Sequence, residues 1–84
     1  MENRIKELIA VGASITANCQ PCLQYHVSKA LESGADQQEI NEAIEVGKMV
    51  RKGAASKMDK FASSLNQVTP ATANASDDGC GCGP

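Results

Sequence analysis

Apolar residues recur at helical spacing in three successive segments of this sequence, and this periodicity constrains the fold more than any other feature. We expect a first helix over residues 4–17, a second from about Cys19 to Ser33, and a third from about Gln37 to Leu65. With 84 residues, the chain has room for one domain. The sequence therefore predicts an all-α protein, a small bundle of three main helices that is completed by oligomerisation.

The predicted helix boundaries carry residues that commonly end and begin helices. Asn18 is expected to cap the second helix, because a short polar side chain can accept hydrogen bonds from the free amides of the first turn. Pro21 is tolerated within that turn. Gly34 is typical of the position after a helix end. Asp36 and Glu39 have the spacing of a capping box, which predicts the start of the third helix.

The predicted core is small and aliphatic. Aromatic residues make up 2% of the sequence, with Tyr25, Phe61 and no Trp. A short chain with such a core is marginally stable and commonly depends on a partner subunit, a metal or a disulfide. The apolar stripe of the third helix is also wider than two short helices can cover, so we expect a homo-oligomer. The stripe consists of Ile40, Ala43, Ile44, Gly47, Val50, Ala54, Met58, Phe61 and Leu65, widened by Val46 and Met49.

The charge distribution argues against several classes of function. The formal net charge is −2, and the near absence of aromatic side chains and of a basic patch argues against nucleic-acid binding. The apolar runs are far shorter than a membrane span, and no charged-then-apolar signal segment opens the chain. We therefore expect a soluble, cytoplasmic protein without nucleic-acid or membrane partners.

The composition changes after the third predicted helix, where Thr, Ala, Asn, Ser, Asp and Gly leave little to bury. We expect a helical domain over residues 1–65 and a flexible tail over residues 66–84 that ends in Cys80-Gly81-Cys82. This motif could be a swinging dithiol that reduces a disulfide elsewhere in the chain, a chelator of a soft metal ion, or an unstructured end.

Three chemically reactive side chains share one face of the second predicted helix. Cys19 and Cys22 are three residues apart, and His26 follows Cys22 by four, so at about 100° per residue all three fall in one narrow stripe. Two thiols at this spacing can close into a disulfide, and a helix N-terminus lowers the pKa of a thiol. His26 lies one turn from Cys22, within reach as a proton acceptor. Glu7, beside the apolar stripe of the first helix, is a candidate to hold the other ring nitrogen.

A metal site is the main alternative for the cysteines. Two close pairs in a chain without a secretion signal indicate redox catalysis or metal binding more than a disulfide framework. Cys19 and Cys22 together with Cys80 and Cys82 could supply four thiolate ligands to zinc or to a softer metal ion. A non-catalytic helical oligomer is the third interpretation.

A longer motif combines these residues. It consists of Glu7, eleven intervening residues and Cys19-Gln20-Pro21-Cys22-Leu23-Gln24-Tyr25-His26, and it continues through Ala30-Leu31-Glu32-Ser33-Gly34-Ala35-Asp36 to Glu39, Ile40 and Ala43. With this motif, residues 7–62 resemble the carboxymuconolactone decarboxylase family and, within it, the alkylhydroperoxidase AhpD-like branch. Peroxidase members of that branch often carry a second histidine between the two cysteines, where this chain has Pro21.

The resemblance implies an all-helical subunit that assembles as a trimer or hexamer. It implies an enzyme, an antioxidant thiol-dependent oxidoreductase that reduces hydroperoxides in the manner of a peroxiredoxin or exchanges disulfides. By resemblance, Cys22 is the attacking thiolate, Cys19 condenses with it to form the redox-active disulfide, and His26, oriented by Glu7, relays the proton. The implied partners are a hydroperoxide or disulfide substrate and a thiol electron donor, with no cofactor besides the disulfide and no metal.

Overall fold

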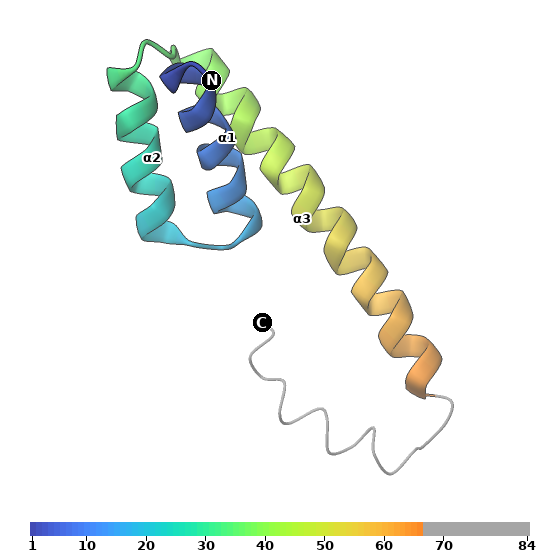
Figure 1. Ribbon diagram of the computed structural model, residues 1–84. Coiled ribbons are helices and arrows are strands. Elements are labelled where there is room, and N and C mark those ends of the chain that lie inside the picture. Colours follow the sequence, from blue (N-terminus) through green and yellow to red (C-terminus); the bar gives the residue numbers. More distant parts are fainter. Residues whose placement is uncertain (67–84) are drawn as a thin grey trace. The chain divides into compact units, whose positions relative to one another are not determined.

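The computed structural model describes residues 1–66 as three α-helices, α1 (Asn3–Thr16), α2 (Gln20–Glu32) and α3 (Gln37–Asn66) (Figure 1). No strand occurs in these residues, which confirms the predicted all-α class. Each helix begins and ends within one residue of the position predicted from the sequence. Residues 67–84, which hold Cys80 and Cys82 of the predicted tail, lie outside the described residues.

The chain divides into a first unit, Met1–Ala54, and a second unit that begins at Ala55. The first unit holds α1, α2 and the beginning of α3, and residues 55–66 of the second unit are helical. The predicted domain over residues 1–65 stays a prediction. In the part of the chain that the structure describes, no helix is both long enough and apolar enough to cross a membrane.

The connection between α1 and α2 corrects one prediction. Asn18 does not cap α2, because its φ of 56° lies in the left-handed region and its N–H donates back to the carbonyl oxygen of Ile15 at 3.1 Å. Asn18 therefore helps to end α1, and Cys19 is the N-cap of α2. Asn is favoured both as an N-cap and in left-handed backbone, so the sequence alone does not separate the two roles.

The beginning of α3 is fixed by the predicted capping box. The N–H of Glu39 donates to Oδ1 of Asp36 at 2.9 Å, and the N–H of Asp36 donates to Oε1 of Glu39 at 3.1 Å. The other carboxylate oxygen of Glu39 pairs with Nη1 of Arg4 at 2.6 Å. One side chain thus starts α3 and ties it to the start of α1. Gly34, with φ 98°, follows the end of α2 as expected.

The helices of the first unit pack around a small aliphatic core. Val11 and Ile40 are fully buried, together with Ala30 and the nearly buried Ala35. Partly buried apolar side chains from all three helices pack against these four residues: Leu8, Leu23, Val27, Ala43 and Ile44. Both aromatic residues of the chain, Tyr25 and Phe61, are more than half exposed, so the core is built without them, as the composition indicated.

Two glycines, Gly12 and Gly47, lie where the backbones of α1 and α3 approach closely. Gly47 is buried, and a Cβ atom placed on it would collide with the carbonyl oxygen of Gly12 and lie 2.8 Å from Cβ of Ile15. A Cβ atom on Gly12 would lie 3.1 Å from the carbonyl oxygen of Ala43. The hydroxyl of Thr16 lies 3.2 Å from the carbonyl oxygens of both Gly12 and Gly47, so it bridges the two backbones. The absence of side chains here sets the distance between the helices.

Gly47→Ala should therefore destabilise the protein, because the added methyl group meets backbone atoms that cannot move aside. We expect a loss of about 1–3 kcal/mol in the free energy of unfolding, the range for overpacking a tight contact. Gly53→Ala is the matched control on the same helix, because a Cβ atom there has no neighbour within 4 Å. The control should gain about 0.5–1 kcal/mol from helix propensity. Urea unfolding followed by circular dichroism measures both, and equal effects would contradict the close approach.

Candidate active site

Cys19 occupies the N-cap position of α2. Its backbone is extended, with φ −106° and ψ 100°, and its sulfur accepts a hydrogen bond from the N–H of Cys22 at 3.3 Å. The first amides of a helix have no partner within the helix, so an N-cap side chain commonly accepts from one of them. Pro21 fits the same turn because it has no N–H that needs an acceptor. The sulfur of Cys19 therefore lies at the positive end of the α2 dipole.

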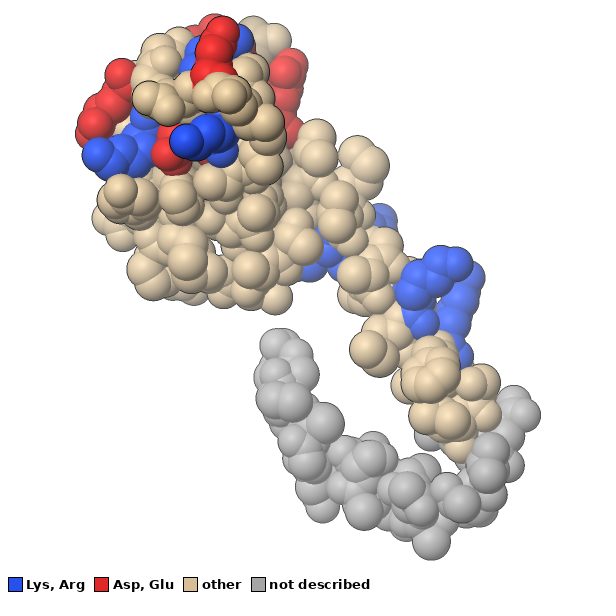
Figure 2. All heavy atoms as spheres, in the orientation of Figure 1, with Lys and Arg blue, Asp and Glu red and all other residues tan. Residues whose placement is uncertain are grey.

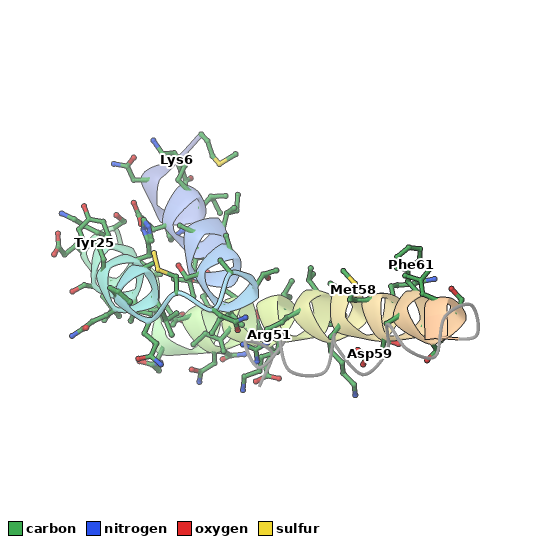
Figure 3. All side chains as sticks on the ribbon, turned by 90° about the horizontal axis from the view of Figure 1, so that it is seen from below. Lys6, Tyr25, Arg51, Met58, Asp59 and Phe61 are labelled. Carbon is green, nitrogen blue, oxygen red and sulfur yellow. A yellow bond between two sulfur atoms is a disulfide. The ribbon has the colours of Figure 1, made fainter. Side chains whose placement is uncertain are left out.

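A disulfide joins Cys19 to Cys22, and Figure 3 shows it as a yellow bond at the start of α2. The two Cα atoms are 5.3 Å apart, so the bond closes within the first turn of the helix. Cys22 is exposed, whereas Cys19 is partly buried. The structure thus describes the oxidised form of the pair, with one of its two residues open to solvent.

His26 and Glu7 meet across the packed faces of α2 and α1. Nδ1 of His26 lies 2.6 Å from Oε1 of Glu7, and both side chains are partly buried, with 30% and 22% of their surface exposed. An ionised carboxylate can only accept a hydrogen bond, so this contact places the ring hydrogen on Nδ1. Nε2 is then the nitrogen that can accept a proton. The structure brings together the histidine and the acid that the sequence singled out, and their catalytic roles stay predictions.

Tyr25 lies beside His26 on the surface of α2. The two rings meet edge to face, with centroids 5.0 Å apart and an interplanar angle of 81°. Nζ of Lys29 lies 5.6 Å from the centroid of the Tyr25 ring. Tyr25 is 56% exposed and contacts the imidazole, a role that the sequence did not indicate. Its edge-to-face contact helps to hold the ring orientation of His26.

A pocket of about 170 Å³ lies beside Cys19. Its lining comes from the end of α1, the α1–α2 connection, the start of α2 and one residue of α3: Ser14, Ile15, Asn18, Cys19, Gln20, Leu23 and Arg51. Nη1 of Arg51 donates to Oδ1 of Asn18 at 2.9 Å and to the carbonyl oxygen of Ile15 at 3.3 Å. These bonds fix the guanidinium group against the α1–α2 connection, as the labelled side chain in Figure 3 shows.

The alternative metal site depends on residues that the structure does not describe. Within residues 1–66, no three His, Cys, Asp or Glu side chains gather closely enough to hold a metal ion. Cys80 and Cys82, the other two ligands of the predicted four-thiolate site, lie outside the described residues. That alternative therefore stays a prediction.

Comparison with known proteins decides the family. The model of the carboxymuconolactone decarboxylase family matches residues 2–62, which is most of the chain. This chain belongs to the carboxymuconolactone decarboxylase family. A relative from Paracoccus denitrificans, named "Uncharacterized protein 4 in cox locus", is 40% identical over 55 residues. The alignment covers 66% of this chain and 50% of that relative, so the chain spans half of the relative's length. No solved structure matches the chain.

The match to the carboxymuconolactone decarboxylase family includes the whole candidate site. Glu7, Cys19, Cys22 and His26 all lie within residues 2–62, and so does Arg51. Sequence reasoning identified the first four, because their spacing along α1 and α2 is local and periodic. It did not single out Arg51. The packing of α3 against α1 brings this arginine to the pocket beside Cys19, and no sequence signal marks that position.

Proposed function

We propose that this member of the carboxymuconolactone decarboxylase family is an AhpD-like thiol oxidoreductase. Cys19 and Cys22 cycle between disulfide and dithiol, and electrons pass from a thiol donor to a hydroperoxide or a disulfide. The observation that carries the proposal is the Cys19–Cys22 disulfide at the start of α2, on the helix whose His26 is held by Glu7. A disulfide between an exposed and a partly buried cysteine can be reached by a reductant in solution.

In the oxidising half-reaction, the thiolate of Cys22 attacks the terminal oxygen of a hydroperoxide. The O–O bond breaks, the sulfur becomes a sulfenic acid, and the alcohol leaves with a proton. Cys19 then attacks the sulfur of Cys22, the S–O bond breaks, and water leaves as the disulfide forms. His26 accepts the proton of the Cys22 thiol, while Glu7 fixes the tautomer in which Nε2 is free to do so.

The N-cap geometry supports the second of these steps. The N–H of Cys22 points at the sulfur of Cys19, and the same donor would stabilise a thiolate there in the reduced form. The thiolate is the nucleophile in disulfide formation, so this hydrogen bond favours Cys19 as the residue that condenses with an oxidised Cys22. The two cysteines thus depend on different groups. The amide at the helix start stabilises the thiolate of Cys19, and His26 accepts the proton of Cys22.

The proposed subunit assembles with further copies through its exposed apolar face. A groove of about 430 Å³ runs between α1 and α3, and its lining is almost entirely apolar: Ile5, Leu8, Ile9, Gly12, Ala13, Thr16, Ala43, Val46, Gly47 and Val50. Ile9, Val46, Met49 and Val50 of the first unit are each more than half exposed. A core with so few buried residues gains substantially when such a face is covered. We propose that a second copy of the chain covers it.

The function is tested by mixing reduced protein with cumene hydroperoxide, in a background where Cys80 and Cys82 are Ser. We expect the dithiol to become the Cys19–Cys22 disulfide, and Cys22→Ser to abolish peroxide consumption. Cys19→Ser should still consume one equivalent of peroxide and leave a sulfenic acid on Cys22 that dimedone traps. His26→Ala should slow oxidation roughly 100-fold, the scale of a lost general base.

Gln24→Ala is the control for the histidine variant, because Gln24 is an exposed residue of the same helix outside the stripe. It should leave the oxidation rate unchanged. If peroxide oxidises none of the cysteines, or oxidises the His26→Ala protein as fast as the parent, the proposed chemistry is wrong.

Assembly is tested by placing a charge on the apolar face. Val46→Glu should dissociate the oligomer, because a buried unpaired carboxylate is costly at an apolar interface. Gln38→Glu adds the same charge at an exposed position of α3 outside the groove and should leave the assembly intact. Sedimentation equilibrium measures the mass of both variants. A parent protein that sediments as a monomer, or a Val46→Glu variant of unchanged mass, would contradict the proposed interface.

A further inference from the structure

Arg51 is the charged side chain that lines the pocket beside Cys19. The other lining residues in the described part of the chain are uncharged. Between Glu7 and Lys29 the sequence has no Asp, Glu, Lys or Arg, so neither the end of α1 nor the start of α2 contributes a formal charge there. Figure 2 shows the same distribution, with an uncharged surface over the α1–α2 connection and the nearest blue atoms on α3. The electrostatic character of this pocket is therefore set by one cation.

Within residues 1–66, Arg51 forms no ion pair with a carboxylate. Its hydrogen bonds to other described residues go to a carbonyl oxygen and to an amide oxygen, and both use Nη1. A guanidinium group has five N–H donors in a planar fork, so Nη2 and Nε keep donors beyond these two bonds. Arg51 is thus a positioned cation with spare donors, which is the arrangement that recognises an anionic group.

We propose that the pocket beside Cys19 receives the thiol that reduces the disulfide, and that Arg51 selects thiols carrying an anionic group close to the sulfur. This inference rests on the proposed thiol–disulfide function of the same site. The structure holds the disulfide, and the oxidised protein is the form that meets the reductant rather than the peroxide. The pocket beside Cys19 has a volume of about 170 Å³, which is below the roughly 300–1,000 Å³ of pockets that enclose whole drug-sized ligands. The pocket therefore suits a short thiol or the end of a longer one.

The chemistry balances with two thiols of the reductant. The first thiol, as a thiolate, attacks the sulfur of Cys19 and forms a new S–S bond. The Cys19–Cys22 bond breaks, and its electron pair leaves on the sulfur of Cys22, which takes up a proton. The second thiolate attacks the reductant's sulfur in the mixed disulfide, so the reductant leaves as a disulfide and Cys19 is released as a thiolate. Two electrons have then passed from the reductant to the protein.

The test compares two thiols of equal length, 2-mercaptoethanesulfonate, which is anionic, and 2-mercaptoethanol, which is neutral. Reduction of the oxidised protein is followed by stopped flow, and each rate constant is expressed per thiolate. The ratio of the anionic to the neutral rate constant should fall about tenfold in Arg51→Gln and be largely kept in Arg51→Lys. Lys52→Gln is the matched control, because it removes the same charge from an exposed position of α3 that does not line the pocket.

A second measurement locates the attack in the unaltered pocket. Oxidised protein with Cys80→Ser and Cys82→Ser is treated briefly with 2-mercaptoethanesulfonate and then with N-ethylmaleimide, and fragment-ion mass spectrometry separates Cys19 from Cys22 within their shared peptide. The sulfonate adduct is expected on Cys19 and the maleimide on Cys22. An adduct on Cys22, or a rate ratio that is the same in the parent and Arg51→Gln, overturns the inference. Both measurements omit peroxide, so a protein that fails to reduce peroxide but keeps the Arg51-dependent ratio would overturn only the proposed peroxide reduction.

Discussion

The close backbone approach of α1 and α3 at Gly12 and Gly47 is the constraint on which the rest of the first unit depends. It sets how α3 passes the end of α1, and so brings the guanidinium of Arg51 to Asn18 and the carbonyl oxygen of Ile15. The same α1 carries Glu7, whose carboxylate holds His26 of α2. The α1–α3 contact thus positions Arg51, whereas the packing of α2 against α1 places His26 on Glu7. A methyl group added at Gly47 would collide with the backbone of α1.

The local features of the fold could be predicted from the sequence, because they depend on residues close together along the chain. The three helices, the capping box of Asp36 and Glu39 and the spacing of Cys19 and Cys22 all belong to this class. The Glu7–His26 contact could also be predicted, since an acid beside an apolar stripe needs a partner. The failures have physical causes. Asn is favoured both as an N-cap and in left-handed backbone, so the role of Asn18 could not be decided from the sequence. The position of Arg51 depends on how α3 packs against α1, which no local sequence pattern specifies.

The candidate site combines a sulfur pair at a helix start with groups supplied by other helices. α2 alone provides the disulfide, the amide that hydrogen-bonds to Cys19, and His26. α1 provides the acid that orients the imidazole, and α3 provides the cation beside the pocket. Each of the three helices therefore contributes a different group to the candidate site. Within the described residues the core contains four buried apolar side chains, and several large apolar side chains stay exposed.

The pH dependence of alkylation at each cysteine shows whether the His26–Glu7 pair activates Cys22. Freshly reduced, metal-free protein is treated with iodoacetamide across a pH series, and the modified positions are read by fragment-ion mass spectrometry. The account predicts that the reactivity of Cys22 rises with an apparent pKa below the ordinary thiol value of about 8.5, and that this pKa moves up in His26→Ala. If all four cysteines titrate alike near the ordinary value, His26 does not activate Cys22 and the account is wrong.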